Sequence, residues 1–142
     1  MRDRMAIGWL AVAGLLGTAC VPAPRQDYTV EQISALEELP ELMRVMYASL
    51  GATWDLAEQA TIAPAELEAA AVAASRVDAV AETLRVRFAD ERGEGFEAYA
   101  GQLAAVAQDL RDAAGAGDDA GEVRRAVKAL GDTCEACHDR YR

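Results

Sequence analysis

The sequence predicts an all-α fold, arranged as an antiparallel four-helix bundle. The 142 residues suffice for one domain with a short N-terminal extension, and alanine, leucine, valine and glutamate dominate the composition, with aromatic residues at 6%. Four stretches with apolar residues at spacings of three and four follow one another, separated by segments that contain glycine or proline. Helices joined by such short connections pack antiparallel around a common apolar core.

The first long amphipathic stretch extends from Leu39 to Ala57. Its apolar face comprises Leu39, Met43, Met46, Leu50, Trp54 and Ala57. Pro40 fits in the first helical turn, where its missing N–H costs nothing. Residues 29–39, TVEQISALEEL, precede this stretch, and Thr29 with Gln32 three residues later forms a capping-box pattern. This pattern predicts a short lead-in helix that ends before the proline.

Three further stretches repeat the helical spacing. The second starts near Pro64 and ends at DERGEGF, the third ends at GAGDD, and the fourth extends to the end of the sequence. Their apolar faces are Leu67, Ala70, Ala74, Val77, Ala81, Leu84 and Phe88, then Phe96, Tyr99, Leu103, Val106, Leu110 and Ala113, then Val123, Val127, Leu130, Cys134, Cys137 and Tyr141. The many alanines allow close helix approach but supply little apolar volume, which leaves room for a large group between the helices.

Residues 1–20 have the layout of an export signal that ends in a lipobox-like sequence. A short basic start precedes an apolar run from Met5 to Leu16, which is too short for a comfortable membrane span. LLGTAC resembles the bacterial lipobox, with Gly17 where leucine is usual, and predicts lipidation of Cys20. Cleavage by ordinary signal peptidase and an uncleaved anchor are the alternatives. Residues 21–28 are expected to form a tether and residues 29–142 the folded domain.

The charge of the chain excludes some partners. A formal net charge of -10 and a pI near 4.5 disfavour binding to nucleic acid and to anionic lipid. The acidity serves solubility or steers association with a basic partner.

Because no nucleophile–base pair and no phosphate-binding glycine loop is evident, the sequence does not predict an enzyme.

The C-terminal sequence CEACHDRYR carries the chemistry. Cys134 and Cys137 are spaced so that both sulfurs lie on one side of a helix, and His138, the sole histidine, follows at once. Two sulfurs and a neighbouring imidazole suit one covalently attached haem, with His138 as iron ligand. A disulfide or redox dithiol and a zinc site are the alternatives. Zinc is disfavoured because a fourth ligand is missing, and a redox dithiol because that motif usually begins a helix in a βαβ unit.

This ending is similar to that of the class II cytochromes c, the family of cytochrome c′ and its low-spin relatives. The family motif CxxCHxxYR is matched by Cys134, Cys137, His138, Tyr141 and Arg142. The resemblance covers residues 29–142 in architecture, but it is specific only in this motif and in one stretch of the first helix. It implies a four-helix bundle with one covalent haem c on the last helix.

The sixth iron position decides the function that the resemblance implies. With no second histidine, the candidates are Met43, Met46 as the less favoured alternative, or an open site. LMR at residues 42–44 is similar to the Leu-Met-Lys of low-spin members, whose methionine binds iron, and this implies Met43. Tyr47 and Trp54 are candidates to line the haem pocket, although buried aromatics in a bundle need no such role. Arg124, Arg125 and Arg142 are weaker candidates to pair with the haem propionates.

The sequence therefore predicts an exported monohaem c-type cytochrome that carries one electron with His/Met ligation. The alternative is a five-coordinate, cytochrome c′-like protein that binds nitric oxide or carbon monoxide. The expected location is the periplasmic side of a bacterial envelope, at the membrane through the lipid anchor. The expected partners are redox proteins of the envelope, bound transiently, and the resemblance also allows a homodimer.

Overall fold

The computed structural model describes residues 27–117 and 119–141. The predicted export signal, the predicted lipidation site Cys20, nearly all of the predicted tether and Arg142 lie outside the described residues. The elements are α1 (Val30–Ser34), α2 (Leu39–Leu50), the 3-10 helix η1 (Gly51–Ala57), α3 (Pro64–Arg92), α4 (Glu94–Ala116) and α5 (Ala120–Tyr141). The described residues contain helices and no strand, so the predicted all-α class is confirmed.

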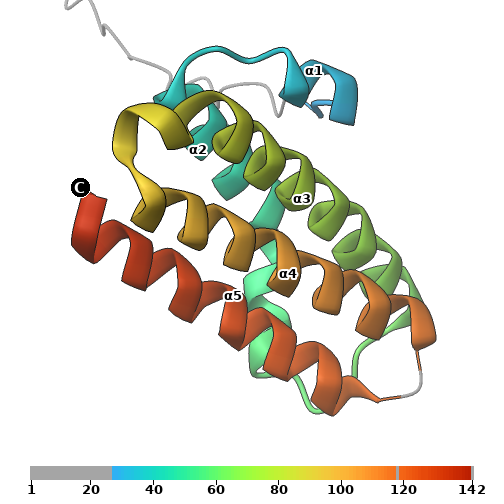
Figure 1. The fold of residues 1–142 in the computed structure, drawn as a ribbon. Coiled ribbons are helices and arrows are strands. Elements are labelled where there is room, and N and C mark those ends of the chain that lie inside the picture. The colour runs from blue at the N-terminus through green and yellow to red at the C-terminus, as the bar shows by residue number, and fades with distance from the viewer. Residues whose placement is uncertain (1–26, 118, 142) are drawn as a thin grey trace, which may run out of the picture.

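The three long helices lie side by side, and each runs opposite to its neighbour in sequence (Figure 1). Helix α4 packs against both α3 and α5, whereas α1 and α2 pack against α3. The 3-10 helix η1 follows α2 and packs against α5. This arrangement places α2 and the C-terminal half of α5 on opposite sides of one interior space.

The helix ends follow the local signals. Thr29 and Gln32 form the predicted capping box, with the Thr29 amide donating to Oε1 of Gln32 at 2.9 Å. Pro40 and Pro64 lie in the first turns of α2 and α3, as expected. Gly93, with φ of 87°, separates α3 from α4, and a left-handed Gly117 ends α4.

The helix expected from Leu39 to Ala57 is divided into two elements in the structure. The α-helix ends at Leu50, because Gly51 takes φ of 2° and ψ of −99°, and a 3-10 helix continues to Ala57. A 3-10 helix has about three residues per turn, so side chains after Gly51 leave the face that an α-helix would give them. The prediction that Trp54 shares a face with Met43 is therefore wrong.

Two apolar clusters fill the interior. One lies between α2, the C-terminal half of α3 and the N-terminal half of α4, and it includes Leu42, Val45 and Leu84. The other joins η1 to the opposite ends of α3, α4 and α5 through side chains such as Leu56, Leu110 and Val127. Over the residues described, no helix combines the length and the apolar character that crossing a membrane would require.

The buried face of α2 is rotated from the predicted one. Leu42 is fully buried and Val45 and Met46 nearly so, whereas Tyr47 is 76% exposed. At about 100° per residue, Tyr47 lies about 140° from Leu42 around the helix, and Met43 about 100°. Met43 therefore lies at the edge of the buried face, and Tyr47 lies beyond that edge. Although Tyr47 is only one helical turn after Met43, its side chain is not buried.

Candidate functional site

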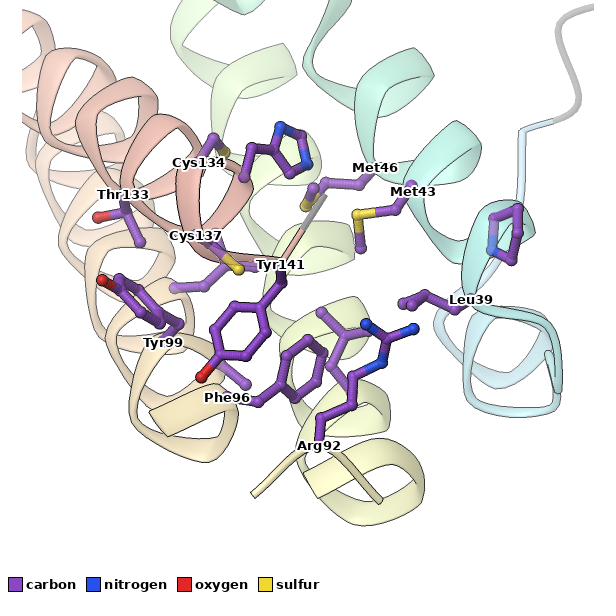
Figure 2. Close-up of a pocket in the computed structure, with 15 residues that line it drawn as sticks. Leu39, Met43, Met46, Arg92, Phe96, Tyr99, Thr133, Cys134, Cys137 and Tyr141 are labelled. Carbon is purple, nitrogen blue, oxygen red and sulfur yellow. The ribbon is translucent and has the colours of Figure 1, made fainter. Parts of the chain in front are cut away.

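An apolar cavity of about 240 Å³ lies between α2, the C-terminal part of α3, the start of α4 and the end of α5 (Figure 2). Its lining residues are Leu39, Pro40, Met43, Met46, Leu84, Arg92, Phe96, Tyr99, Ala100, Leu103, Thr133, Cys134, Cys137, His138 and Tyr141. Both cysteines and the histidine of the CxxCH motif thus line the cavity, together with both methionines of α2.

Cys134, Cys137 and His138 reach the cavity from one face of α5. Residues three and four apart in a helix are neighbours on its surface, so the sulfurs and the imidazole share one side. All three side chains are half-buried, and both cysteines are free thiols. Behind them the buried Thr133 donates its hydroxyl to the Ala129 carbonyl at 2.9 Å, so this polar group is satisfied within α5.

Burial determines the protonation of the two thiols. It raises the pKa of Cys134, and the neighbouring Cys137 raises it further. Burial also raises the pKa of Cys137, opposed in part by the positive charge of Arg92. Redox-active cysteines have a lowered pKa, because the thiolate is the reactive form. The raised pKa values therefore count against the redox-dithiol interpretation. They favour the neutral thiol form of both side chains in the apolar wall of the cavity.

Met43 and Met46 reach the cavity from α2. Figure 2 shows both thioether groups directed into the space between α2 and α5. Met46 is 7% exposed and belongs to the apolar cluster, whereas Met43 is half-buried and packs against the edge of that cluster. Two soft sulfur donors therefore face the side of the cavity that carries His138.

Two predicted pocket residues are not at the cavity. Tyr47 points to solvent because it lies beyond the edge of the buried face of α2. Trp54, on η1, borders a separate surface groove together with Arg124. Its ring lies against Gly131, where an added Cβ would be 3.5 Å from Cζ3, and it packs on both apolar clusters. Trp54 thus joins the two parts of the core.

Arg124 and Arg125, two of the three basic residues proposed for the propionates, lie elsewhere as well. Arg124 donates to the carbonyls of Gln59 and Ala60 at 2.9 and 3.4 Å, which fastens the loop before α3. Arg125 pairs with Glu122 at 3.3 Å. Arg124 precedes His138 by about 21 Å along α5, at 1.5 Å per residue. These two arginines therefore serve the opposite end of the molecule.

The tyrosine of the terminal motif fastens the end of α5 to the start of α4. The ring of Tyr141 packs edge-on against Phe96, with ring centres 5.4 Å apart, and against Tyr99 at 6.0 Å. An added Cβ on Gly95 would lie 2.5 Å from the Tyr141 hydroxyl oxygen, so α4 approaches this ring closely. The contacts hold the last turn of α5, and with it His138, beside the cavity.

Sequence reasoning missed Arg92. This residue ends α3, and its guanidinium lies over the face of Phe96, 5.5 Å from the ring centre. Figure 2 shows it entering the cavity from the side of α3. Arg92 lies within the glycine-containing segment DERGEGF, which predicts a helix end. A helix end alone does not indicate which way the side chain points.

The residues at the cavity fit a covalently held haem. Two thiols and an imidazole on one helix are the donor set that a c-type haem takes, and the remaining walls are mainly apolar and aromatic. The facing thioethers supply the kind of sulfur ligand that occurs opposite histidine in cytochromes. The fit rests on these donors and on the apolar walls around them.

Comparison with known protein families gives one match. The family model described as Cytochrome C' matches residues 90–142, which comprise the end of α3, α4 and α5 with the CxxCH motif. This match is consistent with the class II cytochromes c and confirms, over this part of the chain, the resemblance predicted from the terminal motif. Comparison with curated proteins and with solved structures gave no match.

Proposed function

We propose that this protein is a monohaem c-type cytochrome that carries one electron at a time, with His138 and Met43 as the axial iron ligands. The observation that carries the proposal is the cavity in which Cys134, Cys137 and His138 of α5 face Met43 of α2. The family match over residues 90–142 supports the c-type cytochrome class.

The side chains at the cavity divide the task of holding the group. Cys134 and Cys137 would hold a haem through two thioether bonds, each made by adding the S–H across a vinyl group, with the hydrogen going to the neighbouring carbon, so that no oxidant would be needed. The bound haem iron supplies a one-electron ferric/ferrous couple. His138 would hold the iron through a ring nitrogen, and the contacts of Tyr141 with α4 fix the turn that carries this histidine. The apolar walls exclude water.

Met43 is preferred to Met46 because of its position on α2. Met46 is nearly buried within the apolar cluster, where its side chain fills the core. Met43, at the edge of the buried face, is half-buried and packs against that cluster, and its thioether extends into the cavity. A methionine that is not needed for packing is better able to serve as a ligand.

The proposal extends to the cellular setting that the N-terminal sequence indicates. Export to the periplasmic side of the envelope, lipidation at Cys20 and a tether at residues 21–28 would hold the cytochrome at a membrane surface. The formal net charge of -10 suits transient docking to basic surfaces of envelope redox proteins, and no catalytic reaction is assigned.

Absorption spectra of the holoprotein test the proposal, with Met43→Ala and Met46→Ala as a matched pair. We expect low-spin bands in the wild type in both oxidation states, and a Met-to-iron charge-transfer band when oxidised. Met43→Ala should lose that band, become high-spin and bind carbon monoxide, whereas Met46→Ala should retain the wild-type spectrum and lose stability.

Other outcomes separate the alternatives. A wild type that is high-spin and binds carbon monoxide would favour the five-coordinate gas-binding function instead. Transfer of the spectral change to Met46→Ala would reassign the ligand. Protein that remains colourless in a host competent for haem attachment would refute the cytochrome function.

A further inference from the structure

Arg92 is the one Arg, Lys, Asp or Glu side chain among the described residues that line the cavity. It stands at the last position of α3, where Gly93 with φ of 87° turns the chain into α4. The Arg92 residue is exposed overall, but its guanidinium lies over Phe96 and reaches the cavity. A permanent positive charge thus borders an otherwise mainly apolar space.

The other arginines of the described part of the chain have local functions. Ion pairs with carboxylates engage Arg76, Arg85, Arg87, Arg111 and Arg125. Backbone carbonyls accept hydrogen bonds from Arg44 and Arg124. Arg140 stacks on Tyr141 and is not part of the cavity lining. Within the described residues, Arg92 has no carboxylate partner, even though the chain has 24 acidic residues.

We infer that Arg92 binds a propionate carboxylate of the haem. This inference rests on the proposed function. Haem carries its vinyl groups on one edge and its two propionates on the opposite edge, so a haem attached at Cys134 and Cys137 would direct its carboxylates away from the edge that these cysteines hold. Figure 2 shows Arg92 at the other end of the cavity from Cys134, beside Phe96, with Cys137 and Tyr141 between the two. Arg92 is the cation at that end.

The chemistry of the guanidinium supports this pairing. Its planar set of N–H donors matches the two oxygens of a carboxylate, and it sheds water more readily than an ammonium group. Stacking on Phe96 limits the freedom of the side chain before the carboxylate arrives, so less entropy is lost on pairing. An ion pair bordering an apolar cavity is also less screened than one in open solvent.

The pairing should lower the pKa of the propionate, and this shift can be measured through the pH dependence of the reduction potential. An opposite charge within about 4–6 Å lowers the pKa of a carboxylate by about 1–3 units. An ionised propionate favours the ferric state, so the reduction potential falls as the pH rises through the propionate pKa. The other titratable side chains at the cavity are Tyr99 of α4 and Cys134, Cys137, His138 and Tyr141 of α5. Cys134, Cys137 and His138 are engaged in the holoprotein, and no Asp or Glu is among the described residues that line the cavity.

The test is the pH dependence of the reduction potential of the full-length holoprotein, measured from about pH 4 to pH 9. In Arg92→Met, the propionate inflection should move upward by about one pH unit or more. Arg92→Gln should give the same shift and Arg92→Lys a smaller one. Arg85→Met is the matched control, because it removes the same charge from α3 about 10 Å before Arg92. Its inflection should stay at the wild-type position.

The possible results distinguish this inference from the proposed function. Equal inflections in Arg92→Met, Arg85→Met and the wild type would overturn the role of Arg92 and leave the haem proposal standing. The low-spin spectrum should persist in every arginine variant, since the iron ligands are unchanged. Absence of haem from the wild type would instead overturn the proposed function, and this inference with it.

Discussion

Replacing Gly95 with alanine is expected to destabilise the protein through Tyr141. The new methyl group would lie 2.5 Å from the Tyr141 hydroxyl oxygen, about 0.9 Å closer than ordinary contact, so the ring must move. The ring is held edge-on by Phe96 at 5.4 Å and Tyr99 at 6.0 Å. Each such contact contributes about 0.5–1.5 kcal/mol, so loss of both contacts would cost about 1–3 kcal/mol.

Part of this cost is offset by helix propensity. Alanine is favoured over glycine by about 1 kcal/mol in a helix interior, and by less at the second residue of α4, where Gly95 stands. The net loss in the free energy of unfolding should be about 1 kcal/mol. In a Tyr141→Phe background the hydroxyl oxygen is absent and the same Gly95→Ala change should become neutral or stabilising.

Urea unfolding of the holoprotein, followed by far-ultraviolet circular dichroism, measures this double-variant cycle. The reasoning requires a coupling energy of about 1 kcal/mol between the two sites, with the double variant more stable than Gly95→Ala alone. Additive effects would show that Tyr141 does not lie against the start of α4. The packing that we infer to fix the turn carrying His138 would then be wrong.

Two further predictions concern the core and a helix cap. Leu130 is fully buried one turn before Cys134, so Leu130→Ala should lower the free energy of unfolding in urea by about 2–5 kcal/mol without changing the visible spectrum of the folded protein; a loss below about 1 kcal/mol would contradict the packing. The Ala63 amide and the Gln59 side-chain amide donate to Glu66 at 2.8 and 3.1 Å and lower its pKa from the ordinary 4.5. The carboxylate therefore stabilises the fold above that pH and loses this effect as the pH falls through the lowered pKa, so the stability difference between wild type and Glu66→Gln should shrink on acidification. A difference that stays constant in acid would refute the role of the charge.

The sequence predicts the helices well because their signals are local. Capping at Thr29, prolines in the first turns at Pro40 and Pro64, and glycines at the breaks act within a few residues of the chain. The CxxCH motif is equally local, since Cys134, Cys137 and His138 need only α5 to share a face. The structure adds that this face borders a cavity with the methionines of α2 on its other side.

Features that depend on more than one segment were not predictable in this way. Whether Arg92 turns into the cavity depends on where α3 ends and on the position of Phe96 in the next helix. The location of Trp54 depends on the change from α to 3-10 geometry at Gly51, which no residue spacing reveals. A pattern of apolar spacings assumes one continuous α-helix, so the faces that it predicts for residues after Gly51 are wrong.

The same geometry that removes Tyr47 from the site explains why Met43 remains available to it. A residue at the centre of the buried face, such as Leu42, is enclosed by the core and has little freedom to take another role. A residue well beyond the edge, such as Tyr47, points to solvent. The methionine ligand that we propose would have to lie between these positions, close enough to the interior to be shielded from water and free enough to turn its sulfur into the cavity. Met43, about 100° from Leu42 around α2, meets both conditions.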